Sequence, residues 1–159
     1  MKLVFALILC LINVCAVAAA EPRLVTFDEP YCLNVTVDWD IKRLVQEPNS
    51  EFPPTYELTS VSPKIRLYLM MFEANSELDA YETLQGERLQ AVYSPKIPIQ
   101  KLQWKDDASG FLWIARNSGI AYFQVENQWF RAFFTQDDDD KVSGLEQVIA
   151  VLKSLKRGR

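Results

Sequence analysis

The stretch FLWIARNSGIAYFQVENQWFRAFF, residues 111–134, decides the fold expected of this chain. It holds eight of the nineteen aromatic residues, in short runs separated by Asn117-Ser118-Gly119 and by Glu126-Asn127-Gln128. Polar residues and glycine at such intervals mark hairpin turns. The stretch therefore predicts a three-strand antiparallel meander, with strands at about 111–116, 120–125 and 129–134.

The register of these strands decides which rings share a face, because successive side chains point to opposite sides. We take 117–119 as a three-residue turn and Asn127-Gln128 as a two-residue turn, with Glu126 opposite Trp129. A slip by one residue in the second hairpin would put the charge of Arg131 among apolar side chains, which is unfavourable. One face then holds no polar side chain and is expected to be core: Phe111, Trp113, Ala115, Ala121, Phe123, Val125, Phe130, Ala132 and Phe134.

The opposite face is amphipathic and supplies the candidate binding residues. Either the middle helix and arginine stems cover it, or it binds an apolar small molecule or a protein partner. In the second case Tyr122 and Trp129 should matter for binding while contributing little to the fold. The face is formed by Leu112, Ile114, Arg116, Ile120, Tyr122, Gln124, Trp129, Arg131 and Phe133, and the candidate binding residues are Ile114, Arg116, Tyr122, Trp129, Arg131 and Phe133.

Three further segments have strand patterns. Apolar and polar residues alternate over 31–41, which predicts one half-buried strand. The segments 55–61 and 64–72 predict two more, and the second is apolar on both faces, as expected of a central strand. The segment 47–54 carries three prolines and predicts a loop, as does 105–110. Leu89, Ala91 and Tyr93 alternate before two prolines, which confine neighbouring pairing to a sheet edge.

Two helices are expected. Ser76 is placed to cap the first, which has acidic residues in its first turn, and Gly86 is expected to end it. Ser143 and Glu146 have the spacing of a capping box at the start of the second. This terminal helix carries one apolar stripe: Leu145, Val148, Ile149, Leu152 and Leu155.

These elements predict an α+β domain. It consists of an antiparallel sheet or partly closed barrel of six to seven strands, one middle helix, and a C-terminal helix packed on the sheet. The expected core includes Trp39, Leu67, Leu69, Phe123, Phe130, Phe134, Val148 and Leu152.

The amino-terminal residues predict export. Lys2 precedes an apolar run and Ala18-Ala19-Ala20, which is typical of a secretory signal peptide at 1–20 with cleavage after Ala20. The remainder, 21–159, suits a single soluble domain, secreted or periplasmic according to the host. Asn34-Val35-Thr36 is a possible glycosylation sequon in a eukaryotic host.

Composition excludes several classes of function. Loss of Lys2 leaves 16 basic residues of 17 against 21 acidic ones, a balance that argues against nucleic acid as a partner. The chain has no histidine, and of its three cysteines only Cys32 follows the signal peptide. This excludes an internal disulfide and histidine-dependent catalysis and predicts no cofactor or ordinary metal site; we expect Cys32 to be buried. The run Asp137–Asp140 lacks the spacing of a calcium loop and predicts a charged linker.

We therefore expect an exported, non-enzymatic protein that binds an apolar ligand or a protein partner. One alternative is a carboxylate-dependent hydrolase that uses Asp38 and Asp40, and another is a structural extracellular component. The length, meander and terminal helix resemble the lipocalins, but Trp39 lacks the Gly-x-Trp signature of that family because Val37-Asp38 precedes it. The chain is accordingly assigned to no family.

Overall fold

The computed structural model describes residues 23–27, 30–35, 38–44, 53–90, 97–105, 108–137 and 141–158. Within these ranges the chain forms two helices and ten strands, arranged in two antiparallel sheets. The predicted α+β class, with one middle and one C-terminal helix, is confirmed. The predicted signal peptide, its cleavage site and most of the predicted loop at 47–54 lie outside the described residues.

The larger sheet has seven strands, in the order β3-β4-β5-β9-β8-β7-β6. The predicted strands at 55–61 and 64–72 are β4 and β5 to the residue, and β5 lies between β4 and β9 as expected of a central strand. β6 is an edge strand and ends at Lys105, and β7 begins at Ala108, so the loop predicted at 105–110 is shorter than expected. The bounds are β3 Trp39–Arg43, β4 Thr55–Val61, β5 Lys64–Phe72, β6 Gln100–Lys105, β7 Ala108–Ala115, β8 Ser118–Val125 and β9 Gln128–Gln136.

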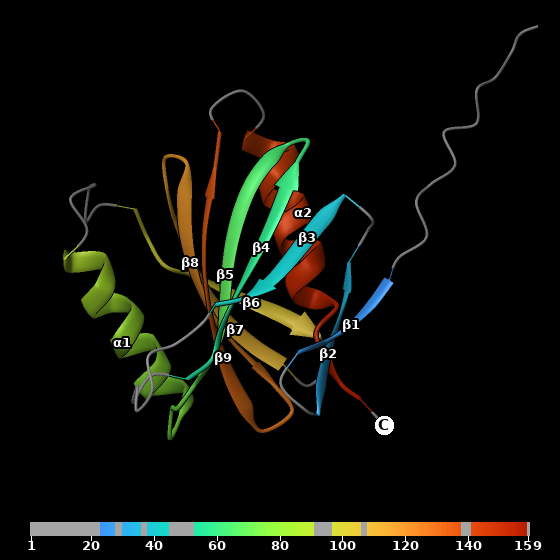
Figure 1. The fold of residues 1–159 in the computed structure, drawn as a ribbon. Coiled ribbons are helices and arrows are strands. Elements are labelled where there is room, and N and C mark those ends of the chain that lie inside the picture. Colours follow the sequence, from blue (N-terminus) through green and yellow to red (C-terminus); the bar gives the residue numbers. More distant parts are fainter. Residues whose placement is uncertain are drawn as a thin grey trace, which may run out of the picture.

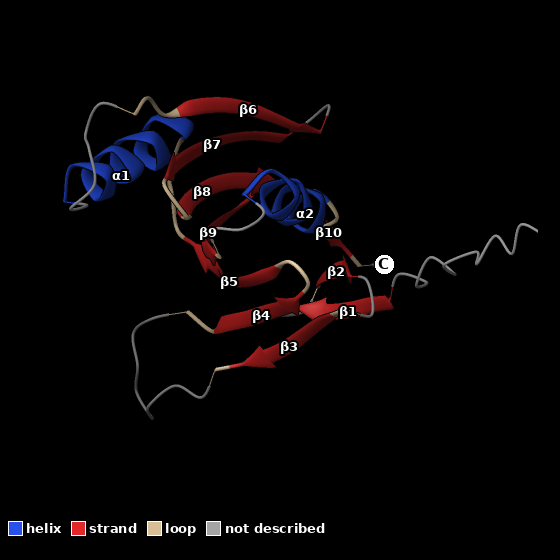
Figure 2. Ribbon diagram, turned by 90° about the horizontal axis from the view of Figure 1, so that it is seen from above, coloured by secondary structure: helices blue, strands red, loops and turns tan. Residues whose placement is uncertain are grey.

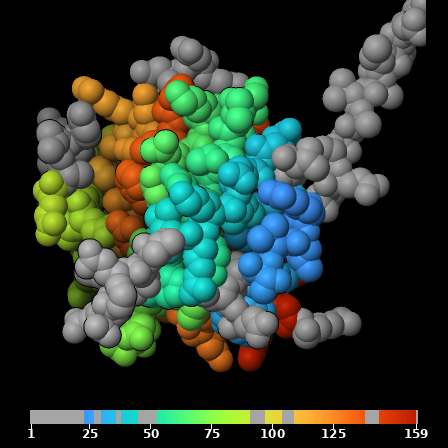
Figure 3. Space-filling view, viewed as in Figure 1, coloured from blue at the N-terminus to red at the C-terminus, as the bar shows by residue number. Residues whose placement is uncertain are grey.

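The smaller sheet has the order β1 (Arg23–Phe27), β2 (Tyr31–Val35), β10 (Lys156–Arg157). The prediction of one continuous strand over 31–41 is therefore wrong, because β2 and β3 belong to different sheets. Both halves of the segment bury apolar side chains in the same core, so their alternation does not reveal the break. The guanidinium of Arg23 in β1 donates a hydrogen bond to the carbonyl of Trp39 in β3, and Figure 3 shows these two strands side by side.

Helix α1 (Glu77–Gln90) follows β5. The hydroxyl of Ser76 accepts a hydrogen bond from the backbone N–H of Asp79 at 3.1 Å, which confirms Ser76 as the cap. Gly86 does not end the helix, because it has no positive φ and the helix continues to Gln90. Leu89, expected in an extended segment, is therefore helical, and 91–96 lie outside the described residues.

Helix α2 (Lys141–Lys153) begins before Ser143, so this serine lies in the first turn and is not the N-cap. The predicted stripe is confirmed: Val148, Leu152 and Leu155 are buried, and Leu145 and Ile149 are partly buried against the core. α2 packs against β2, β5 and β9. Asp137 is exposed, whereas 138–140 lie outside the described part of the chain.

The seven-stranded sheet separates two apolar layers. α2 and the small sheet cover one face, whereas α1 lies on the other face, over β7 and β8 (Figures 1 and 2). All eight predicted core residues are buried, in the layer that faces α2. Cys32 is a buried free thiol, as expected.

Candidate functional site

The first hairpin of the meander corrects the predicted faces. Ala115 pairs with Ser118, so Arg116 and Asn117 form a two-residue turn, and Arg116 takes the positive φ of 53° that such a turn requires. The turn was predicted to contain three residues and contains two. Because of this change, every side chain of β7 lies on the opposite face, relative to β8, from the one predicted. Phe111, Trp113 and Ala115 therefore lie on the face of Tyr122, under α1.

The second hairpin differs without reversing the faces. Glu126 and Asn127 form its turn, and Trp129 pairs with Gln124 and not with Glu126 as predicted. The partner of each β9 residue is thus displaced by two residues along β8. An even displacement leaves each side chain on its predicted face. It does change the neighbours: Tyr122 now lies directly opposite Arg131.

The structure brings four of the six predicted binding residues together. Tyr122, Trp129, Arg131 and Phe133 share the face toward α1. Ile114 instead packs into the layer on the α2 side, because β7 is reversed. Arg116 is exposed in the β7–β8 turn.

The four residues on the α1 face are not an open surface. Tyr122 is 1% exposed and Trp129 3% exposed, so both are part of the fold. The expectation that they contribute little to stability is therefore wrong, because α1 buries Ala80 and Leu84 against this face. Arg131 and Phe133 remain partly accessible.

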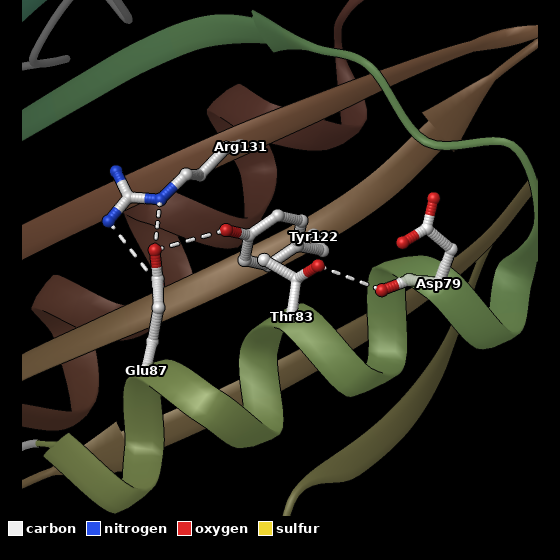
Figure 4. A network of polar contacts seen from close by, with 5 residues as sticks. All are labelled: Asp79, Thr83, Glu87, Tyr122 and Arg131. Atoms are coloured by element: carbon white, nitrogen blue, oxygen red, sulfur yellow. Dashed lines mark hydrogen bonds and ion pairs between the residues drawn. The ribbon is translucent and has the colours of Figure 1, made fainter.

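A polar network joins α1 to this face (Figure 4). The Glu87 carboxylate accepts hydrogen bonds from Arg131 Nε at 2.9 Å and Nη2 at 3.3 Å, and from the Tyr122 hydroxyl at 3.1 Å. The side chains of Arg131 and Glu87 are 23% and 28% exposed, so the ion pair is only partly screened by water. Glu87 thus fixes the position of α1 over the β8–β9 hairpin.

The network shifts two pKa values. Burial raises the pKa of the Tyr122 hydroxyl well above its ordinary value, and the Glu87 charge raises it further, while Arg131 acts in the opposite direction. Burial lowers the pKa of Arg131, but the hydrogen bonds and charge of Glu87 outweigh burial and leave this pKa raised. Tyr122 is therefore neutral and Arg131 charged throughout the physiological range.

A groove opens between α1 and strands β5 and β9, beside this network. Its volume is about 740 Å³, within the range of small-molecule sites. Met70, Met71, Phe72 and Pro53 supply its apolar lining. Its polar lining consists of Glu73, Thr83, Glu87, Tyr122, Gln128 and Arg131.

Strand register explains why the groove forms there. Met70 pairs with Arg131, which pairs with Tyr122, so three side chains from β5, β9 and β8 form one row across the sheet. The ring of Phe72 meets that of Tyr122 edge to face, with centroids 4.7 Å apart. α1 lies over β7 and β8, and its Glu87 and Thr83 close one side of the groove over this row.

Sequence reasoning missed Met70, Phe72, Glu87 and Gln128 as site residues. The apolar second face of 64–72 was the available signal for Met70 and Phe72, because a partly covered apolar face is one wall of a groove. Nothing local marks Glu87, which is one of several acidic residues in α1.

The other predicted positions lie away from the groove. Asp38 and Asp40 are both exposed. Asn34 is also exposed, and its backbone N–H and carbonyl both hydrogen-bond to the Ser154 hydroxyl. No three metal-ligating side chains converge within the described ranges.

Comparisons with known proteins assign no family. No family model matches the chain, and no curated protein matches it. A crystal structure of a GTP binding regulator from Thermotoga maritima superposes with a TM-score of 0.37 and 15% identity, over 76% of this chain and 80% of that chain. A similarity this low supports no inference. No described helix is long and apolar enough to cross a membrane.

Proposed function

We propose that this chain is an exported, non-enzymatic binding protein that holds an apolar small molecule in the groove between α1 and the sheet. The observation that carries the proposal is the groove itself. It combines a volume of about 740 Å³ with an apolar wall that includes Met70 and the ring of Phe72. Methionine and aromatic side chains adapt to apolar ligands of different shape, and a few fixed polar groups orient them.

The polar residues beside the groove favour binding over hydrolysis. The Glu87 carboxylate accepts hydrogen bonds from Arg131 and Tyr122, so its oxygens are already occupied by contacts within the fold. Asp38 and Asp40, the pair considered for a hydrolase, lie outside the groove lining. The expectation of export rests on residues 1–20 alone.

The test uses the neutral fluorescent probe N-phenyl-1-naphthylamine, titrated into the mature protein. Saturable binding at one site per chain is expected. Met70→Trp fills the groove and should weaken binding about tenfold or more. The matched control is Tyr68→Trp, which places the same indole two residues away on the same strand face but outside the groove, and should change affinity by no more than about twofold.

Circular dichroism must show that each variant is folded. If Met70→Trp does not fold, Met70→Ala takes its place, since it removes part of the apolar wall and should also weaken binding. Absence of saturable binding, or equal affinity in the Met70 and Tyr68 variants, would overturn the proposal. If the wild-type chain binds no probe but co-purifies with another protein, the result would support the alternative of a protein partner.

A further inference from the structure

The hydrogen-bond donors that line the groove are largely engaged within the protein. The Tyr122 hydroxyl and two nitrogens of Arg131 donate to Glu87. The Gln128 amide donates to the carbonyls of Phe72 at 3.0 Å and of Trp129 at 2.9 Å. These groups are fixed by the fold and offer a ligand little further donation.

Thr83 on α1 is a further hydrogen-bond donor of the lining that is already engaged. Its hydroxyl donates to the carbonyl of Asp79 at 2.9 Å, one turn back in α1 (Figure 4). That leaves the lone pairs of the oxygen as its contribution to the groove. The remaining side-chain donors of the lining are the second N–H of Arg131 Nη2 and the two of Nη1, on a guanidinium whose charge Glu87 already compensates.

Two side-chain acceptors of the lining, those of Glu73 and Gln128, are in contrast available. Glu73 has neither a hydrogen bond nor an ion pair to any residue in the described part of the chain. The carbonyl oxygen of the Gln128 side chain likewise has no partner among the described residues. A ligand that enters the groove therefore meets acceptors and one unpaired carboxylate.

The charge of the groove points in the same direction. Its lining carries Glu73 and Glu87 against Arg131, so one negative charge is left over, and the whole chain has a net charge of −4. An acidic concave site attracts cations and repels anions. The ring of Phe72 adds an electron-rich surface, which also favours a cationic group.

We propose that the ligand is a cationic amphiphile, with an apolar body against Met70 and Phe72 and a protonated amine directed at Glu73. This inference rests on the proposed binding function and specifies its ligand class. The N–H groups of the amine can donate to Glu73 and to the side-chain carbonyl of Gln128. Its positive charge compensates the one excess negative charge of the lining. A fatty acid would bring its carboxylate next to Glu73 and Glu87, where the like charges repel.

The experiment compares three ligands of equal chain length, decylamine, decanol and decanoate, as competitors of N-phenyl-1-naphthylamine at neutral pH. Each is kept below the concentration at which it self-associates. Decylamine should displace the probe at a concentration about tenfold lower than either of the others. Glu73→Gln should remove this advantage. The control is Glu82→Gln on α1, which removes the same charge outside the groove lining and should keep the preference.

The outcomes separate the two proposals. Probe binding without a preference for decylamine, or with a preference for decanoate or decanol, overturns the ligand class and leaves the binding function standing. A preference that survives Glu73→Gln overturns the role of Glu73. Absence of probe binding overturns the binding function itself.

Discussion

The ring of Phe134 lies against Gly119, its cross-strand partner on β8. A Cβ atom added to Gly119 would lie 2.6 Å from Cε1 of this ring and 3.0 Å from the carbonyl oxygen of Trp113. Phe134 is fully buried, so its ring has little room to move. The absence of a side chain at Gly119 is thus a packing requirement of the meander.

Gly119→Ala should lower the free energy of unfolding by about 1–3 kcal/mol, because the new methyl group overpacks the core. Urea denaturation measures the loss. The double variant Gly119→Ala, Phe134→Leu should lose less than the sum of the two single changes, since the smaller side chain relieves the contact. Strict additivity would contradict this account of the site.

For Gly86 we expect the opposite effect of an alanine substitution on stability. It lies in the interior of α1, and a Cβ added there would meet nothing within 4 Å. Gly86→Ala should therefore stabilise the protein by about 0.5–1 kcal/mol, because alanine loses less backbone entropy in a helix. A loss of stability in the same urea assay would show that α1 does not continue through this position.

Phe123 tests the core on the α2 side. It is buried and stacks on Phe130, with ring centroids 5.8 Å apart. Phe123→Ala should cost about 3–5 kcal/mol of stability, as truncation of a core ring does. Phe133→Ala, which removes a partly exposed ring stacked on Tyr68, is the matched control and should cost clearly less. A loss below about 1 kcal/mol for Phe123→Ala would contradict its placement.

Tyr122 predicts a loss of stability at alkaline pH. Its pKa is raised in the folded state, chiefly by burial and then by Glu87, above the value of about 10 for an unfolded tyrosine. The contribution of the neutral Tyr122 hydroxyl to the free energy of unfolding is complete below about pH 10. It is lost as pH rises further, because the unfolded chain then releases the tyrosine proton and the folded chain retains it. The free energy of unfolding should fall there by up to about 1.4 kcal/mol per pH unit.

Denaturant melts between neutral and alkaline pH measure this slope. Tyr122→Phe should lose about 1 kcal/mol at neutral pH, the net contribution of one hydrogen bond, and show a shallower alkaline decline. Tyr31, whose pKa burial and then Glu126 also raise, accounts for part of the slope that remains. Parallel curves for the wild type and Tyr122→Phe would contradict the prediction.

Local patterns in the sequence determined the elements and much of the core. Strands β4 and β5 match their predicted bounds, because alternation over seven to nine residues reports directly which side chains face a core. The cap at Ser76 could also be predicted, because its hydrogen bond with the N–H of Asp79 depends only on residues in the first turn. Burial of Phe130 and Leu152 likewise followed from the periodicity of their own segments.

Only the tertiary structure decided how these elements combine. Turns of two and three residues both suit the residues after Ala115, yet the choice between them reverses β7 and moves Trp113 from one layer to the other. The break between β2 and β3 depends on which sheet each half joins, and the alternating pattern is compatible with either arrangement. The groove exists because β5, β9 and α1 bring Met70, Arg131 and Glu87 together from positions far apart in the chain. No local pattern encodes such a contact, since it is formed by packing between elements and not within one.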